Sequence, residues 1–162
     1  MIRTISLVAL AGLALAGCGG AAPKGAAENA SRLLAASVKG DRVAFEAEID
    51  RPAVRDDVRR QMAVVAAAKT LDVEGGPSEF ALDRMIGPDA LRLVRAGAGE
   101  ALTVAPTVGQ VTRLMKGLDS RHACLRDAAA PDRCLLTFAR GKDGWRLVGM
   151  KATELTIEVA GD

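Results

Sequence analysis

Apolar residues recur at helical spacing along the first part of the chain. A first helix is expected over 26–39, where every third or fourth residue is apolar. Asp41 and Asp50 each precede a further repeat of this kind, so we expect them to cap helices over 42–48 and 51–69. The third helix has one apolar stripe, made by Val54, Val58, Met62 and Val65 or Ala66.

Glycine and proline divide the middle of the chain into short elements. Ser78 is expected to cap a helix over 79–86, which ends at Gly87. A second helix is expected over 89–95 and a third over 107–116. The single Gly-x-Gly at 97–99 follows no predicted strand, so it does not indicate a nucleotide-binding loop.

The apolar pattern then changes to a period of two, which is typical of strands. Strands are expected over 118–126, 134–140 and 145–151, with 153–159 extending or following the last, and residues 141–144 form a tight hairpin. Helices followed by meandering strands predict an α+β domain, with N-terminal helices packed on an antiparallel meander of three to four strands. By analogy, its topology is expected to be cystatin-like or nuclear-transport-factor-like.

Alternation along these strands assigns their side chains to two faces. If Cys124 stands opposite Cys134, His122 pairs near Leu136, and Phe138 faces Leu147 in the next hairpin. One face then forms the core under the helices and collects Cys124, Cys134, Leu136, Phe138, Trp145 and Leu147. The other face carries Leu125, Leu135, Val148 and Met150, so a helix or a partner must cover it.

The N-terminus has the pattern of an export signal. Arg3 precedes an apolar stretch over 5–16, which is too short for the roughly 20 residues of a spanning helix. The stretch ends in Leu15, Ala16, Gly17 and Cys18, which resemble the lipobox of bacterial lipoproteins. The resemblance implies a signal peptide over 1–17 and lipidation of Cys18, including a palmitate chain, as the membrane anchor. An ordinary secretory signal cleaved after Ala16 and an uncleaved anchor are the alternatives.

The residues after Cys18 extend this expectation. Residues 18–26 are expected to be a lipidated tether and 27–162 a single α+β domain. Gly19 stands where enterobacterial lipoproteins retained in the inner membrane carry Asp. The resemblance therefore favours the periplasmic side of the outer membrane.

Cys124 and Cys134 are the other two cysteines of the chain, and an oxidising compartment favours a disulfide between them. A zinc or redox site that also uses His122 is an alternative, because His122 and Cys124 share one face of a strand. Unpaired thiols are the other alternative. No fourth ligand stands at metal spacing, so no metal is expected. His122, the only histidine, is expected mainly to pack beside the bridge or border the surface, and is kept as a candidate binding residue.

Composition excludes several function classes. The 162 residues are 49% hydrophobic and 26% charged, and 22 Lys and Arg residues face 20 Asp and Glu residues, which gives a net charge of +2. This balance of charges argues against non-specific electrostatic binding of nucleic acid. Aromatic residues make up only 2% of the chain, so few side chains can stack on bases, sugars or flavins. No cofactor is therefore expected.

Two clusters of charged residues were weighed for function. Arg55, Arg59 and Arg60 span one turn of the third helix and are candidates for binding lipid headgroups or an acidic partner, with a solvated helix face as the alternative. The carboxylates at 46–50 and 56–57 form no convincing acid–base pair. Asp119 is expected to point away from Ser120 and His122, because it alternates with them along a strand.

The segment from Ala35 to Arg60 resembles a family of small bacterial envelope proteins known only as a domain of unknown function. The residues that carry the likeness are a Gly-Asp turn at 40–41, an Asp-x-Pro-x-Val-Arg signature at 50–55, a Gly-Pro in the middle and a Trp-x-Leu near the end. The family signature usually has an aromatic residue where Arg51 stands. No activity comes with this resemblance.

These patterns predict a non-catalytic, lipid-anchored periplasmic protein that binds an envelope protein or a small amphiphile. The membrane is its expected partner through the anchor, and nucleic acid is not expected. An envelope enzyme with a site in the helix–sheet cleft near His122 is the first alternative. A purely structural accessory lipoprotein is the second.

Overall fold

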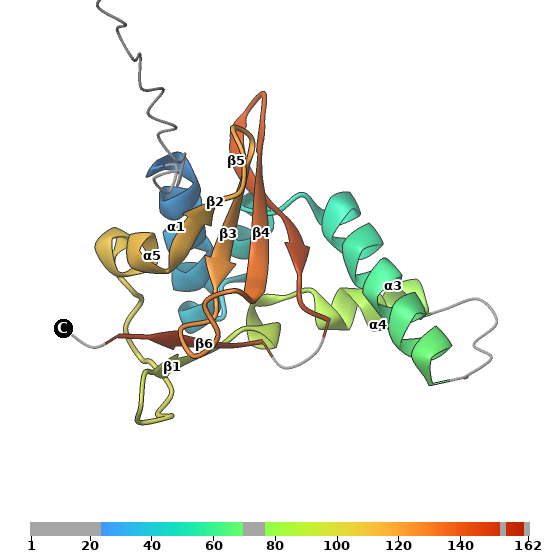
Figure 1. The fold of residues 1–162 in the computed structure, drawn as a ribbon, viewed down its shortest axis with the longest axis horizontal. Helices are drawn as coiled ribbons and strands as arrows, with labels where there is room; N and C mark the ends of the chain where they lie inside the picture. The colour runs from blue at the N-terminus through green and yellow to red at the C-terminus, as the bar shows by residue number, and fades with distance from the viewer. Residues whose placement is uncertain (1–23, 70–76, 153–154, 161–162) are drawn as a thin grey trace, which may run out of the picture.

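The computed structural model describes residues 24–69, 77–152 and 155–160, and it is an α+β fold (Figure 1). Helices dominate the N-terminal side and an antiparallel sheet the C-terminal side, as the sequence predicted. The helices are α1 (Lys24–Lys39), α2 (Arg42–Ala47), α3 (Arg51–Ala68), α4 (Glu79–Met85), the short 3-10 helix η1 (Pro88–Ala90) and α5 (Val108–Leu114). The strands are β1 (Arg92–Arg95), β2 (Met115–Gly117), β3 (His122–Arg126), β4 (Cys134–Gly141), β5 (Gly144–Met150) and β6 (Thr156–Val159).

The expected helix caps are present. The Asp41 carboxylate accepts a hydrogen bond from the N–H of Ala44 and begins α2, and Asp50 does the same for Ala53 at the start of α3. Ser78 caps α4 in the same way. Helix α1 begins at Lys24, which lies within the predicted tether, and Ala26 in its first turn is fully buried.

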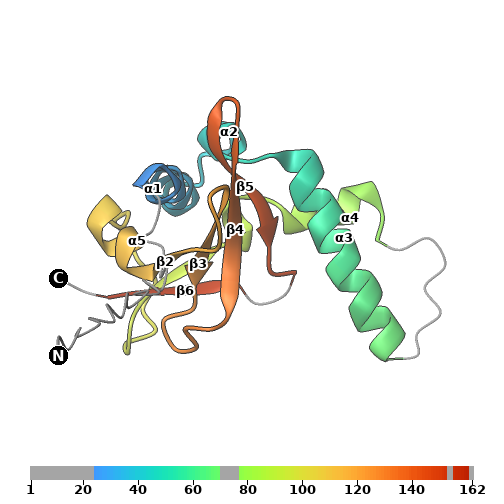
Figure 2. The ribbon, with the colours of Figure 1, turned by 45° about the horizontal axis from the view of Figure 1, so that its top comes forward.

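The main sheet has the strand order β2-β3-β4-β5, and all its neighbouring strands are antiparallel. Helix α1 packs against β4 and β5, and α3 runs beside β5 at one edge of the sheet (Figures 1 and 2). The connection between α2 and α3 pairs with this edge, because Asp50 N–H donates to the Leu147 carbonyl at 2.8 Å and Leu147 N–H to Glu48 at 3.0 Å. The edge strand β5 is therefore covered along this stretch.

One core joins the main sheet to the helices and extends to the small sheet of β1 and β6. Its largest fully buried side chains are Phe45, Phe138, Leu33, Leu34, Leu82, Ile86, Leu125, Leu136, Leu147 and Ile157. Helix α2 turns Phe45 inward, whereas Val43 on the same helix is 82% exposed. The predicted stripe of α3 is buried at Val54 and Val58. Val65, further along α3, is exposed.

Two predicted helices are wrong in part. Residues 89–95 were expected to form a helix, but only a short 3-10 turn forms before strand β1, which pairs in parallel with β6 as a separate two-stranded sheet. Helix α5 ends at Leu114, and the chain continues as β2. Each segment has only one or two apolar residues, Leu93 and Val94 in β1 and Met115 in β2, which are too few for periodicity to separate a strand from a helix.

The predicted register between β3 and β4 is also wrong. Cys124 pairs with Thr137, and Cys134 pairs with Arg126 after an irregularity at the end of β3. The core face of these strands consequently carries Ala123, Leu125, Leu136 and Phe138, while the cysteines lie on the opposite face. The prediction assumed that bridged cysteines stand directly opposite each other, whereas here they are diagonal neighbours. The expected pairing of Phe138 with Leu147 is confirmed.

Candidate functional site

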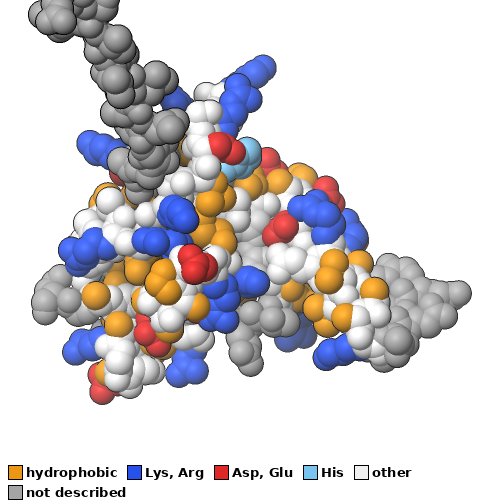
Figure 3. Space-filling view, viewed as in Figure 1, with side chains coloured by type: hydrophobic (Ala, Val, Ile, Leu, Met, Phe, Trp, Pro, Cys, Tyr) orange, Lys and Arg blue, Asp and Glu red, His pale blue; other side chains and the backbone are white. Residues whose placement is uncertain are grey.

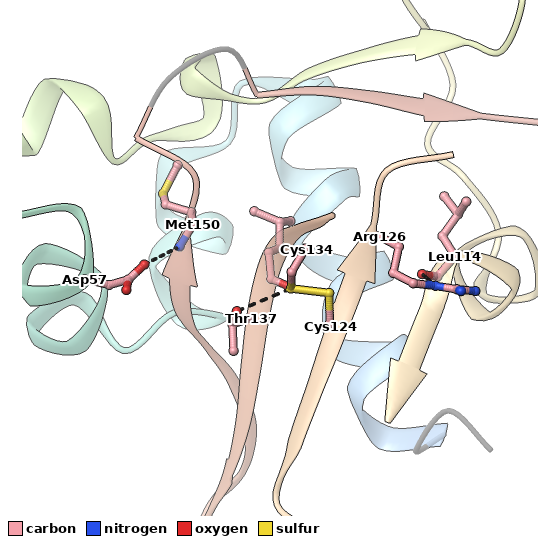
Figure 4. Close-up of a disulfide and its surroundings, with 8 residues drawn as sticks. Asp57, Leu114, Cys124, Arg126, Cys134, Thr137 and Met150 are labelled. Atoms are coloured by element: carbon pink, nitrogen blue, oxygen red, sulfur yellow. Dashed lines mark hydrogen bonds between the residues drawn. A yellow bond between two sulfur atoms is a disulfide. The ribbon is translucent and has the colours of Figure 1, made fainter. Parts of the chain in front are cut away.

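A cleft between α3 and the second face of the sheet lies beside the two cysteines. The sulfur atoms of Cys124 and Cys134 lie 2.15 Å apart, which is compatible with the predicted disulfide (Figure 4). The cleft has a volume of about 230 Å³. Its lining comes from α3, β4 and the end of β5: Asp57, Gln61, Cys134, Leu135, Thr137, Met150 and Lys151.

Asp57 and Gln61 line this cleft, and their polar atoms hold α3 on β5. The Asp57 carboxylate accepts hydrogen bonds from Gln61 Nε2 at 2.8 Å and from the N–H of Met150 at 3.2 Å (Figure 4). Gln61 also donates to the Met150 carbonyl at 2.8 Å and accepts from the N–H of Ala152 at 3.1 Å. We call Asp57 and Gln61 the α3 clamp. Because both side chains already have partners, the cleft is explained as a joint between helix and strand.

The candidate binding residues Arg55, Arg59 and Arg60 all have carboxylate partners. Arg55 binds Asp83 through Nε at 3.0 Å and through Nη2, and it lies 3.4 Å from Glu79. Arg59 binds Glu79 as well. These contacts join α3 to α4 across their facing surfaces.

Arg51 extends the same network at the start of α3. It binds Glu46 of α2 and also Asp83, at 2.9 Å. The bonds from Arg55, and then from Arg51, hold the pKa of Asp83 below its ordinary value. Arg60 lies 3.1 Å from Asp57. The predicted basic face of α3 is therefore largely neutralised by neighbouring carboxylates.

The other carboxylates between α2 and α3 are engaged too. Glu48 is held by Arg32 Nε at 2.7 Å and by the Asn29 amide, both from α1. Asp50 caps α3. Each of these groups therefore has a positioning role, and none faces a second carboxylate as an acid–base pair does.

His122 stands beside a carboxylate, contrary to the expectation from strand alternation. Its Nδ1 lies 2.8 Å from Asp119 Oδ2, and the two side chains are 47% and 56% exposed. Asp119 lies in a turn before β3, where alternation does not apply, and it also accepts the N–H groups of Arg121 and His122 at 2.7 Å. The Arg121 N–H, and then the imidazole, hold the pKa of Asp119 below its ordinary value.

Three cations gather next to this pair, at the end of the sheet where the chain turns before β3 and between β4 and β5. Arg121, Arg140 and Lys142 line an open pocket of about 460 Å³ together with Ser120 and Gly141. In the part of the chain that the structure describes, none of the three makes an ion pair or a side-chain hydrogen bond. Figure 3 shows Lys and Arg side chains projecting at this end, above the histidine. We call the three residues the cationic tip.

Sequence reasoning missed the cationic tip. Arg121 is separated along the chain from the other two residues, and strand pairing brings them together: the Arg140 N–H donates to the Arg121 carbonyl at 2.8 Å. The only available signal was a charged residue at each of two neighbouring turns of a predicted meander. That signal depends on the register, which the sequence analysis misjudged.

One large apolar surface lies on α3 and α4, at the other side of the molecule. Phe80 of α4 is 71% exposed and Val64 of α3 is 69% exposed. Figure 3 shows hydrophobic side chains gathered over this region. Phe80 is one of only three phenylalanines in the chain, so its exposure is a costly placement for a protein poor in aromatic residues.

The described residues contain no group of three or more His, Cys, Asp or Glu side chains arranged to hold a metal ion. None of the helices described is both long enough and apolar enough to cross a bilayer.

No family model, curated protein or solved structure matches this chain. The likeness to an envelope family between Ala35 and Arg60 therefore stays a prediction. Six of the residues predicted as candidate sites lie in three places: Arg55, Arg59 and Arg60 in the network between α3 and α4, Cys124 and Cys134 at the cleft, and His122 beside the cationic tip. Cys18, the predicted lipidation site, lies outside the described residues, as does the predicted signal peptide over 1–17.

Proposed function

We propose that this protein is a lipid-anchored protein on the periplasmic side of the cell envelope, attached through Cys18, and that its folded domain binds an envelope protein without catalysing a reaction. The export signal and the Leu-Ala-Gly-Cys sequence at 15–18 support the anchor. The outer membrane is the proposed location, since Gly19 follows the cysteine. The anchor alone makes the membrane its first partner.

The observation that carries the binding role is the exposed apolar surface of Phe80 and Val64. Large aromatic side chains left in water are typical of protein interfaces, where their burial supplies much of the binding energy. The neighbouring arginines of α3 are bonded to carboxylates, and Arg84 of α4 lies over the Phe80 ring, 5.9 Å from its centroid. Burial of Phe80 and Val64 would thus supply the binding energy, with Arg84 at the rim of the interface. A small amphiphile is the other ligand of this chemistry.

The anchor is tested with Cys18→Ser. The variant is expected to lose incorporation of labelled palmitate and to leave the membrane fraction, because the thiol is the only attachment point for the lipid. Cys124→Ser is the control, since its cysteine lies in the fold. Palmitate labelling of the Cys18→Ser variant at the normal level would contradict the anchor.

The binding role is tested by crosslinking and affinity capture from intact envelopes with the lipidated chain as bait. A variant with Phe80→Ser and Val64→Ser is expected to lose the captured envelope protein, while Val43→Ser keeps it. Val43 is a matched control because it is 82% exposed on α2. Equal capture by both variants would show that this surface is not the binding site, and a lipid-like molecule in place of a protein would favour the amphiphile.

An envelope enzyme acting near His122 is a second candidate, and the contact between His122 and Asp119 favours it. A carboxylate that holds one ring nitrogen leaves the other free to move a proton. This candidate predicts that His122→Gln abolishes an activity of the envelope while membrane anchoring and capture of the partner persist. A purely structural accessory lipoprotein predicts that neither His122→Gln nor the Phe80 variant has an effect.

A further inference from the structure

The cationic tip brings together three cations that have no ion pair among the described residues. Arg121, Arg140 and Lys142 are exposed and unpaired in the described ranges, unlike the arginines of α3. Three carboxylates lie nearby. Asp119 is turned toward backbone N–H groups and the His122 ring, Asp50 caps α3, and Asp143 shares the hairpin turn with Lys142. None of the three lines the open pocket, which the cations line together with Ser120 and Gly141.

The tip lies at the same end of the molecule as the start of α1. A Cβ atom added to Gly25 would stand 2.8 Å from Cδ1 of Trp145, so the first turn of α1 rests on the Trp145 indole. Trp145 pairs with Arg140 at the end of the hairpin. Figures 1 and 2 show the hairpin between β4 and β5 rising at this end, while α3 extends away from it.

The distance along the chain from the proposed anchor to this end is short. Five residues lie between Cys18 and Lys24, the first residue of α1, and the six steps from one to the other reach at most about 20 Å at about 3.5 Å per step. A lipid on Cys18 therefore keeps the start of α1, and the tip beside it, close to the headgroups of the membrane. Lys24 lies at this end too, but its charge is paired with Glu28 at 3.8 Å.

We infer that the cationic tip docks onto anionic phospholipid headgroups of the membrane that carries the anchor. This inference rests on the proposed lipidation of Cys18, which supplies the proximity. Each Lys or Arg near an anionic surface raises the ratio of docked to undocked molecules about five-fold, so the three cations together raise it about 100-fold. Docking fixes one orientation: the tip faces the bilayer, while α3 and α4 lie away from the hairpin that carries the tip (Figures 1 and 2).

The test measures how close the tip stands to the headgroups in lipidated full-length protein reconstituted into vesicles. One set contains phosphatidylcholine alone, a second also contains a third of phosphatidylglycerol, and both carry a dansyl-labelled headgroup. Trp145 is the only tryptophan of the chain and lies beside the tip, so energy transfer from it to dansyl reports docking. We expect greater transfer in the anionic vesicles, and its loss at 1 M salt, where the Debye length falls to about 3 Å.

Two charge-reversal variants make the test specific. Replacing Arg121, Arg140 and Lys142 by Glu is expected to lower the ratio of docked to undocked molecules by 100-fold or more and to bring transfer down to its level in neutral vesicles. Replacing Arg92, Arg95 and Arg113 by Glu changes the net charge equally, and these cations are exposed on β1 and α5. Transfer in this control is expected to stay at the level of the unchanged protein.

The outcomes separate the tip from the anchor, because flotation with the vesicles is measured on the same samples. Equal energy transfer in neutral and anionic vesicles, or an equal loss of energy transfer in both variants, would contradict docking of the tip. Neither result would contradict the anchor. Equal energy transfer is also the result expected if the tip binds an acidic protein instead of lipid. A chain that does not float with neutral vesicles would contradict the anchor. Energy transfer from Trp145 to dansyl in anionic vesicles would still show whether the tip docks on anionic headgroups.

Discussion

Two groups of arginines in this protein have the same charge but different surroundings. On α3, Arg51, Arg55 and Arg59 are bonded to carboxylates from α2 and α4, so their charge is used inside the fold. At the cationic tip, Arg121 and Arg140 have no such partner among the described residues. The first group is therefore expected to matter for stability and the second for binding. Local sequence does not show the difference, because the partners of α3 come from other elements.

The same contrast separates the cleft from the tip. At the cleft, the α3 clamp is satisfied by backbone groups of β5, and the cysteines join β3 to β4. At the tip, the polar groups face solvent. Changes at the cleft should therefore lower the free energy of unfolding and leave docking on anionic vesicles intact. Changes at the tip should weaken docking and leave the free energy of unfolding nearly unchanged.

The largest effect is expected from removing the disulfide. Replacing Cys124 and Cys134 by Ala should lower the free energy of unfolding by about 2.5–3 kcal/mol, because the bridge closes a ten-residue loop in the unfolded chain. Urea denaturation followed by circular dichroism measures the loss. A reductant should destabilise the natural chain by a similar amount and leave the variant unchanged.

The bridge itself is checked by labelling thiols in the protein without reductant. Neither Cys124 nor Cys134 should react, and both should react after unfolding with reductant. Strong labelling of both in the untreated protein would show that the thiols are free. In that case the double variant should cost much less than the predicted amount.

The second effect is expected at the α3 clamp. In Gly149→Ala, the new Cβ would stand 2.8 Å from Asp57 Oδ2 and 3.1 Å from its Cγ, so the carboxylate must leave its place. Loss of its bonds to Gln61 and the Met150 N–H should lower the free energy of unfolding by about 1–2 kcal/mol. Alanine in a strand is otherwise slightly better than glycine, so the direction of the change identifies the clash.

Gly109→Ala is the matched control for this variant. Its new Cβ would meet only Thr107 Oγ1, at 3.9 Å, and the position lies within α5. Alanine there should raise the free energy of unfolding by about 0.5–1 kcal/mol. In an Asp57→Ala background, Gly149→Ala should cost little, because the clashing carboxylate is gone. If Gly149→Ala lowers the free energy of unfolding by the full amount in that background, the destabilisation does not come from the clash with Asp57.

The third effect concerns acid stability and again separates α3 from the tip. The bonds from Arg55, and then Arg51, lower the pKa of Asp83 from its ordinary value of 3.8. The stabilisation that goes with this lowered pKa is complete above about pH 4 and is lost as the pH falls through the lower pKa of the folded protein. Arg55→Gln should therefore lower the thermal midpoint slightly at pH 7, since the pair is partly exposed, and by less as the pH approaches 2.

Thermal unfolding followed by circular dichroism between pH 7 and about pH 2 measures this convergence. Arg140→Gln is the control, because no carboxylate in the described residues depends on Arg140. A constant gap between Arg55→Gln and the natural chain at every pH would show that Arg55 acts through packing and not through Asp83.

Local signals in the sequence were enough to predict most of the helices. Asp41, Asp50 and Ser78 each combine a capping side chain with a following apolar repeat, and each caps the helix it was expected to cap. The hairpin between Gly141 and Gly144 was also predicted from its local residues, because glycine is common in tight turns. In the structure Gly144 adopts a φ of 107°, a conformation that favours glycine. These features depend on a few neighbouring residues.

Features that depend on distant pairing were not predicted. Strand β1 was expected to be a helix because its partner, β6, is more than 60 positions away and its two apolar residues, Leu93 and Val94, are too few to show a period. The register of β3 and β4 was placed by assuming that Cys124 faces Cys134 directly. Tertiary contacts of this kind also bring Arg55 to its carboxylate partners and bring the three residues of the cationic tip together. The basic residues of α3 were therefore predicted to be free for binding, although they are paired within the fold.

The smallest effect on stability is expected at the tip itself, and it is the sharpest test of the contrast. Replacing Arg121, Arg140 and Lys142 by Gln should change the free energy of unfolding by less than about 0.5 kcal/mol, because exposed side chains without partners contribute little to folding. Arg51→Gln, which leaves Glu46 and Asp83 without a shared partner, should cost about 1 kcal/mol or more for a single change. Urea denaturation of the two variants side by side measures the difference. If the tip variant is the less stable of the two, its cations are part of the fold, and the division between structural and binding arginines fails.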